Sequence, residues 1–160
     1  MRRLLTLFVI LGAIACTSQG NSNENKSTLE KGKEIAGASF TSLSAELMTA
    51  IGAGGPESAL ELCQLRALPI TDSLSEYFEV TIKRSALKYR NSKNKPDSSE
   101  LAALVKYSEE ISKGNQPKPF VVNVNGKERF IAPIPTKALC LSCHGLPGVN
   151  IQESVETKIN

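Results

Sequence analysis

FVVNVNGKERFIAPI, residues 120–134, is the stretch that decides the fold class, because it predicts a β-hairpin in a mainly helical chain. Residues 120–124 and 127–134 are predicted to be two strands, because Asn125-Gly126 between them is a strong signal for a two-residue turn. Segments with helical periodicity precede the hairpin. The sequence therefore predicts an α+β domain, with a small antiparallel sheet flanked by N-terminal helices.

Two helical segments are predicted at the start of the domain. The run Gly52-Ala53-Gly54-Gly55 stops the first segment, and Pro56 starts the second at a position where proline is tolerated. Pro69 should kink or divide the second segment. The apolar stripes consist of Ala36, Phe40, Leu43, Leu47 and Ile51 in the first segment and of Leu60, Cys63, Ala67, Ile70 and Leu74 in the second.

One more strand and one more helix are predicted before the hairpin. Residues 79–84 alternate apolar or long side chains with polar ones, as in a half-buried strand. Asp97 or Ser98 is expected to cap a third helix, which ends at Gly114. The apolar side of this helix is expected from Leu101, Leu104, Val105 and Ile111.

The N-terminus predicts export. A basic start, an apolar run too short to span a bilayer and small residues before Cys16 are typical of a signal peptide over residues 1–15. Cys16 predicts a lipid-anchored bacterial lipoprotein, although Ala13 stands where a leucine is usual. The alternative to the lipoprotein is ordinary cleavage of the signal peptide near this site, which would release a soluble periplasmic protein. Residues 16–28 are then a flexible tether and residues 29–160 a single domain outside the cytoplasm.

The net charge of the chain does not point to any particular class of binding partner. The formal net charge of +3 falls to about +1 when Arg2 and Arg3 leave with the signal peptide. No run of Lys and Arg suggests a polyanion site, and no glycine pattern suggests a nucleotide site. Nucleic acid is therefore not an expected partner.

Cys140-Leu141-Ser142-Cys143-His144 predicts covalent attachment of one c-type haem. The two thiols can form thioethers to the two vinyl groups of one porphyrin, and the adjacent imidazole can bind the iron. A thioredoxin-like pair should instead begin a helix in a βαβ unit, whereas this motif follows a hairpin and a proline-rich run. A zinc site needs four ligands, and beyond the two thiols only Cys63 and His144 remain.

The second axial ligand of the iron comes from a short list. His144 is the only histidine, so the opposite face needs a methionine or a thiolate, or stays open. Met48 lies on the flank of an apolar stripe, where filling a gap is its expected role. Cys63 is left over once Cys16 and the motif have their uses. The residues alone leave Cys63 as either an axial ligand or a small buried hydrophobe.

Three blocks of the sequence, ALELC (59–63), KRSALKYRN (83–91) and ALCLSCHG (138–145), occur in this order. They resemble a family of single-haem c-type cytochrome domains with a PAS-like fold, long known as a domain of unknown function. Members occur as stand-alone exported proteins and as extracytoplasmic domains of bacterial sensor kinases. The resemblance covers roughly residues 29–159.

This resemblance implies axial ligation by a histidine and a cysteine, which correspond here to His144 and Cys63. The arginine–asparagine block of the family matches Arg84 and Arg90-Asn91, with a serine next where a proline is frequent. Arg84 is expected either to bind a haem propionate or to reach solvent from the end of a strand.

The C-terminus departs from the family, whose domain continues to a closing strand. Asn150-Ile151-Gln152-Glu153 predicts a capped helix start, with Ile151, Val155 and Ile159 on one face. The chain then stops at Asn160. We expect either a sequence truncated at its C-terminal end or a domain that leaves a sheet edge exposed.

Together these features predict an exported mono-haem cytochrome that acts as a redox or gas sensor, with a periplasmic electron carrier as the alternative. A thiolate ligand stabilises ferric iron, so reduction should weaken the Cys63–iron bond and open the site to CO or NO. A carrier should keep both ligands in both states. We do not expect an enzyme, because the sequence contains no evident catalytic constellation. A peroxidase, for example, would need further acid–base groups. A separate redox or signalling protein is the expected partner.

Overall fold

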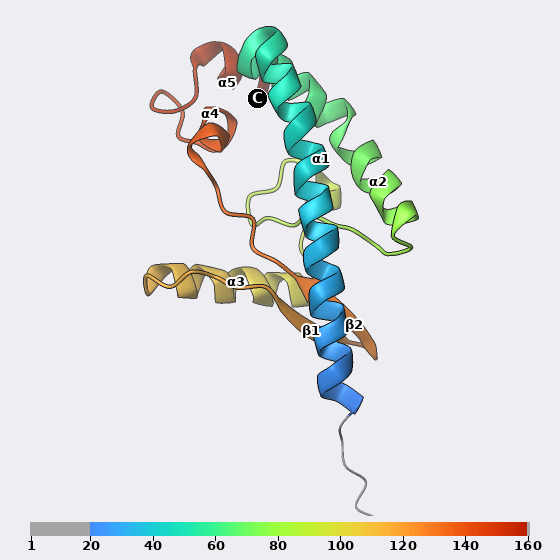
Figure 1. The fold of residues 1–160 in the computed structure, drawn as a ribbon. Helices are drawn as coiled ribbons and strands as arrows, with labels where there is room; N and C mark the ends of the chain where they lie inside the picture. Colours follow the sequence, from blue (N-terminus) through green and yellow to red (C-terminus); the bar gives the residue numbers. More distant parts are fainter. Residues whose placement is uncertain (1–19, 160) are drawn as a thin grey trace, which may run out of the picture.

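The computed structural model describes residues 20–159, with side chains from residue 25 onward except those of 63 and 64. The predicted signal peptide (1–15) and Cys16 lie outside the described residues. The described residues contain helices and a two-stranded antiparallel sheet, which lies beside the helices Gly20–Leu65 and Ser98–Ser112, and they confirm the α+β class (Figure 1). None of the helices between residues 20 and 159 is long and apolar enough to cross a membrane. The elements are α1 (Gly20–Leu65), α2 (Ala67–Tyr77), η1 (Ser92–Asn94), α3 (Ser98–Ser112), β1 (Phe120–Val124), β2 (Lys127–Ile131), η2 (Ala138–Cys140), α4 (Leu141–His144) and α5 (Glu153–Ile159).

α1 consists of two helical segments that meet at Gly54 and Gly55, where φ/ψ are −165°/27° and 70°/−167°. Gly55 adopts backbone dihedral angles that residues other than glycine rarely adopt. Pro56 then begins the second segment, where its missing N–H costs nothing. The chain reverses direction at this point, so the second segment and α2 run back along the first (Figure 1). The predicted interruption and restart are confirmed.

The division predicted near Pro69 occurs at Arg66, between α1 and α2. Pro69 lies in the first turn of α2, where backbone N–H groups have no partner within the helix. An ion pair of 3.4 Å joins Arg66 to Glu46 of the first α1 segment. This contact helps to hold the two antiparallel helical stretches together.

The strand predicted over residues 79–84 does not form. Its side chains alternate between exposed and half-buried, as predicted, but the sheet in residues 20–159 contains only β1 and β2. The backbone finds other partners: the Ile82 N–H donates to the Ser75 hydroxyl at 3.1 Å, and the Ala86 N–H to the Asn94 carbonyl at 3.4 Å. The alternation therefore comes from packing on one side of an extended segment, not from a β-ladder.

The hairpin agrees closely with its prediction. β1 and β2 pair antiparallel, with Phe120 opposite Ile131. Asn125 and Gly126 have φ of 53° and 78°, the positive values that a two-residue hairpin turn requires. β2 ends at Ile131 rather than at residue 134, because Pro133 cannot donate to a ladder. Each strand has one edge without a strand partner in the described part of the chain.

α3 packs against the hairpin with a face that the sequence analysis did not predict. Its buried residues are Ala103 and Tyr107. The Tyr107 hydroxyl donates to the Ile131 carbonyl at 3.0 Å, and its ring meets that of Phe120 edge to face, with centroids 5.6 Å apart. These two contacts select the face that is buried. The side predicted to be buried is largely exposed, by 44% at Leu101, 47% at Val105 and 63% at Ile111.

The first turns of α1 are ordered against the hairpin. Thr28 donates to the carboxylate of Glu128, and Gly32 lies so close to Phe130 that a Cβ there would be 2.1 Å from the ring. Residues 20–28, expected to belong to a flexible tether, are therefore helical in the structure. Residues 16–19 of the predicted tether lie outside the described residues.

The C-terminal helix begins later than predicted. The Asn150 side chain accepts from the Leu146 N–H at 3.2 Å, so it stabilises a turn rather than a helix start. The first N–H groups bonded within α5 use the carbonyl of Gln152 instead. Ile151 and Val155 are buried, with Val155 fully so. The predicted apolar face is thus confirmed, but not the predicted cap.

Candidate functional site

The Cys-x-x-Cys-His motif forms a single turn in which η2 runs directly into α4. The Cys140 N–H donates to the Lys137 carbonyl, and the Gly145 N–H to the Leu141 carbonyl, both at 2.9 Å. Cys140 and Cys143 are both half-buried. Residues three apart in such a turn lie on the same side of it. Both thiols can therefore reach one planar ligand.

The chain after the motif folds back onto it. Gly145 approaches Asn150 so closely that a Cβ would lie 2.4 Å from both the Asn150 Cβ and the Leu141 carbonyl oxygen. Further on, α5 packs against α1, and Lys158 pairs with Glu57 at 3.2 Å. The motif is thus attached on its C-terminal side to the second segment of α1.

Two arginines of the loop 83–95 act on His144. Arg90 Nη2 donates to the Cys143 carbonyl in a long hydrogen bond of 3.5 Å. Although His144 is exposed as a residue, partial desolvation of its ring lowers its pKa below 6.5, and the positive charges of Arg90 and Arg84 lower it further. At neutral pH the imidazole is therefore neutral, the form that binds metal ions.

Glu100 of α3 determines the direction of Arg84. Lys83 donates to Glu100 at 2.7 Å, and Ser85 also hydrogen-bonds to this carboxylate. Alternate side chains of an extended segment point to opposite faces. Because both neighbours of Arg84 turn toward α3, Arg84 is directed to the other side, where its charge acts on His144.

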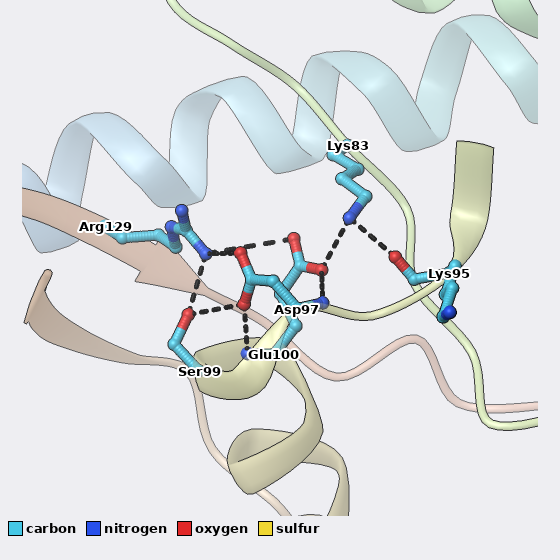
Figure 2. Close-up of polar contacts among 6 residues, drawn as sticks. All are labelled: Lys83, Lys95, Asp97, Ser99, Glu100 and Arg129. Carbon is cyan, nitrogen blue, oxygen red and sulfur yellow. Dashed lines mark hydrogen bonds and ion pairs between the residues drawn. The ribbon is translucent and has the colours of Figure 1, made fainter.

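Figure 2 shows the polar network around Glu100, which joins the loop, α3 and β2. Lys83 donates to the Lys95 carbonyl at 2.8 Å, and Arg129 pairs with Asp97 at 2.6 Å. Hydrogen bonds from the Glu100 N–H and from Arg129 hold the pKa of Asp97 well below its usual range. Burial raises the pKa of Glu100, but the hydrogen bonds from Lys83 and the Asp97 N–H outweigh it, so that the net shift is downward. Both carboxylates are therefore ionised at neutral pH.

An open pocket of about 610 Å³ lies between the motif and the loop. This volume is within the range of small-molecule sites. A second hollow, of about 520 Å³, lies between α3 and the segment before β1 and has no cysteine or histidine in its lining. The lining of the larger pocket includes Lys88, Tyr89, Arg90, His144, Leu146 and Asn150.

The candidates for the second axial ligand have different positions. Cys63 has its backbone in the second segment of α1, and its side chain lies outside the described residues. Ala59, one helical turn earlier, is only 1% exposed, and this end of α1 lies near α4 and α5 (Figure 1). Met48 is 54% exposed, so it does not fill a gap as predicted, because the flank on which it lies is uncovered.

The sequence analysis predicted the motif and Arg84 as site residues, and the structure brings Arg84, Arg90 and His144 close enough for their charges to interact. Sequence reasoning missed Glu100 and Arg129, which hold the loop in place. The spacing of Asp97 and Glu100 is that of a capping box, which the structure contains. Nothing local predicts the contacts of Glu100 with Lys83. Among the side chains that the structure describes, no group of three or more His, Cys, Asp or Glu residues is placed to hold a metal ion.

Comparison with known families gives one match. The model of the Tll0287-like family matches residues 14–159, so this chain, an α+β protein with a Cys-x-x-Cys-His turn beside a basic loop, belongs to the Tll0287-like family. The name of the family denotes no enzymatic activity. No curated protein and no solved structure matched the chain.

Proposed function

We propose that this protein is an exported, lipid-anchored mono-haem c-type cytochrome that acts as a redox or gas sensor. The observation that carries the proposal is the turn at residues 140–144, where two half-buried thiols precede an imidazole whose pKa is lowered. Zinc would require further ligands close by, whereas covalent haem attachment uses only these three groups. When bound, haem c supplies a one-electron redox centre that can also bind a diatomic gas.

The surroundings of the turn fit a haem in their chemistry. Leu141 and Leu146 contribute apolar surface to the pocket, and Lys88 and Arg90 contribute positive charge. A haem needs both, because its macrocycle is apolar and its two propionates are anionic. In this proposal Cys140 and Cys143 hold the macrocycle covalently and His144 is one axial ligand.

Propionate binding falls to the arginines, with Arg84 as the candidate predicted from the sequence. Glu100 orients it toward the side on which its charge reaches His144. Guanidinium groups bind carboxylates with two parallel hydrogen bonds, so this contact would also fix the orientation of the macrocycle. Arg90, which already contacts the turn through the Cys143 carbonyl, is the second candidate.

Cys63 is the proposed second axial ligand. Its helical segment is the one to which α5 attaches the chain after the motif, through the ion pair between Lys158 and Glu57 at 3.2 Å. Met48 is the alternative on the first segment. A thiolate would stabilise ferric iron, whereas a thioether would raise the reduction potential.

A PAS-like architecture is part of the proposal, and the family resemblance supports it, although residues 79–84 form no strand in the structure. This segment is extended and lacks a strand partner among residues 20–159. In a PAS-like domain it would belong to a larger sheet. A crystal structure of the haem-loaded protein tests this: backbone pairing of residues 79–84 with a strand supports the PAS-like fold, and an unpaired segment contradicts it.

The first experiment asks whether haem is attached. The full chain is expressed with c-haem maturation machinery, and covalent haem is detected by haem stain on a denaturing gel. We expect a stained band that is lost in the double variant Cys140→Ala, Cys143→Ala. The control Ser142→Ala, within the same turn, should keep the stain. An unstained wild-type protein that is folded and exported would overturn the proposal.

The second experiment identifies the axial ligand and separates a sensor from a carrier. Ferric spectra of Cys63→Ala should differ from those of the wild type, whereas Met48→Leu should leave them unchanged. The ferrous protein is then exposed to CO. Spectral changes on CO binding support the sensor, and a ferrous spectrum unaffected by CO supports the electron carrier, the second candidate, which the basic loop beside the motif also favours.

The anchor has its own test. Cys16→Ser should move the protein from the membrane fraction to the soluble periplasmic fraction, and it should abolish incorporation of labelled fatty acid. If the protein is soluble even with Cys16 intact, the lipoprotein part of the proposal is wrong.

A further inference from the structure

The loop between α2 and α3 concentrates positive charge beside the haem-attachment turn. Residues 80–96 contain no aspartate or glutamate. Uncharged residues separate most of the cations, so the sequence shows no conspicuous run of them. The basic side chains of this segment are Lys83, Arg84, Lys88, Arg90, Lys93 and Lys95.

Hydrogen bonds between its two ends close the loop. Lys83 donates to the Lys95 carbonyl at 2.8 Å, and the Ala86 N–H donates to the Asn94 carbonyl at 3.4 Å. Lys83 is also paired with Glu100, which attaches the closed loop to α3 (Figure 2). The loop is therefore a preformed surface, and ordering it on binding costs little conformational entropy.

Three other cations of the loop are available to a partner. Lys88, Lys93 and Lys95 are exposed. No ion pair with a carboxylate involves any of these three in the part of the chain whose side chains are described. Like charges on one short loop repel one another, and a docked acidic surface would reduce this repulsion.

The loop also lies at the position where an electron would enter or leave. Arg90 contacts the Cys143 carbonyl, and Lys88, Tyr89 and Arg90 line the same pocket as His144. A macromolecule that docks on the loop therefore comes close to the proposed haem. This proximity favours a redox protein over an anionic membrane, because a membrane on this face would cover the pocket without exchanging an electron.

We propose that the closed basic loop 83–95 is the docking surface for an acidic one-electron redox protein. The proposal rests on the proposed function, because it assigns the loop to the haem that the adjacent turn would hold. Charge complementarity of this kind increases association rates by roughly 10- to 1000-fold at low salt, and the increase disappears as salt screens the charges.

Binding to a defined acidic probe tests the proposal without relying on electron transfer. The haem-loaded full chain is titrated with an acidic flavodoxin in a calorimeter at about 10 mM and about 150 mM salt, between which the Debye length falls from roughly 30 Å to roughly 8 Å. We expect the affinity to fall about tenfold or more over this range. The variant Lys93→Glu, Lys95→Glu, which leaves the pocket lining unchanged, should weaken binding about tenfold at low salt.

A charge-matched variant provides the control. Lys31→Glu, Lys127→Glu makes the same change in net charge on α1 and at the hairpin turn, at the end of the molecule remote from α4 (Figure 1). It should alter the affinity by less than about twofold. An equal loss in both variants would show that only net charge matters, and it would overturn the assignment of the loop.

Two further readouts complete the test. Oxidation of the ferrous protein by hexacyanoferrate(III), which takes one electron from the iron and becomes hexacyanoferrate(II), should slow in the loop variant but not in the control. Binding to anionic phospholipid vesicles is measured in parallel. If the loop variant loses vesicle binding but keeps its affinity for flavodoxin, the surface is a membrane contact and the proposal is wrong.

The failure of this inference can be told apart from that of the proposed function. A wild-type chain without covalent haem disproves the proposed function before any titration. A chain that carries haem, yet binds flavodoxin equally well with or without the loop charges, disproves only the docking surface.

Discussion

The unit formed by α3 and the hairpin contains buried residues and a paired polar network, whereas none of residues 132–150 around the motif is buried. Both regions expose apolar side chains, which in α3 are those of Leu101, Val105 and Ile111. In the first, Tyr107 is buried and hydrogen-bonded, and Asp97, Glu100 and Arg129 are paired with one another. The second exposes large apolar side chains, by 69% at Ile134, 44% at Leu139, 36% at Leu141, 65% at Leu146 and 75% at Val149.

This contrast indicates which region depends on a ligand. The α3–hairpin unit reaches its structure with contacts that the chain itself supplies. Residues 132–150 gather apolar surface around two thiols and an imidazole, and such a surface usually marks a binding site. In the proposed cytochrome, haem would cover part of this surface. The motif region should therefore depend on haem for its stability, and the α3–hairpin unit should not.

The largest expected effect is on proteolysis. Haem-free wild-type protein should be cleaved within residues 132–150 at least about tenfold faster than haem-loaded protein, because a bound ligand lowers the population of open states. Limited digestion followed by mass spectrometry measures the rate at each site. Cleavage within residues 98–131 is the internal control and should not depend on haem. Equal rates at 132–150 in both forms would remove the contrast between the two regions.

The second prediction concerns the contact between α1 and the hairpin. Gly32→Ala should destabilise the protein by about 1–3 kcal/mol, because the new methyl group overlaps the ring of Phe130. Gly37→Ala lies in the same helix with no atom within 4 Å of the new Cβ, and it should stabilise the protein by up to about 1 kcal/mol. Urea unfolding measures both. A similar gain in both variants would mean that the hairpin does not rest on Gly32.

The third prediction concerns the network at the start of α3. Asp97→Ala removes the helix cap and should cost about 0.5–2 kcal/mol, while Asp97→Asn keeps a capping oxygen and should cost less. The folded pKa of Asp97 is lowered from 3.8. Its contribution to stability is therefore complete above pH 3.8 and is lost as the pH falls toward the folded pKa. Urea unfolding at pH 7 and at pH 3 should show a smaller pH effect in Asp97→Asn than in the wild type.

The smallest expected effect is that of one hydroxyl group. Tyr107→Phe should cost about 1 kcal/mol through the lost hydrogen bond to Ile131. Tyr77→Phe is the control, since Tyr77 is 79% exposed, and it should change stability by less than about 0.5 kcal/mol.

The same tyrosine gives an alkaline signature. Burial raises the pKa of Tyr107 from 10.0 to about 12, so its contribution to stability is complete below pH 10 and is lost as the pH rises toward 12. Tyr107→Phe should reduce the loss of stability between these two values. Identical alkaline unfolding of variant and wild type would show that Tyr107 is not buried against the hairpin.

Local signals gave correct predictions where the structure depends on local chemistry. The Asn125-Gly126 turn, the break before Pro56 and the cap of α3 each follow from the conformations open to one or two residues. Predictions failed where distant partners decide. Residues 79–84 have the pattern of a strand, but no strand lies beside them in the described part of the chain. The buried face of α3 is set by Phe120 and the Ile131 carbonyl, which the pattern of α3 itself does not contain.

The sequence alone determined the α+β class, the two-residue hairpin turn and the five residues of the Cys-x-x-Cys-His motif, because each depends on the chemistry or spacing of adjacent residues. Only the tertiary structure placed Arg84 and Arg90 near His144, and only it showed that Glu100 holds the loop that carries them. The physical reason is that charges act through space. Which charges lie close together depends on how separate segments pack, and neighbouring positions in the sequence do not specify this.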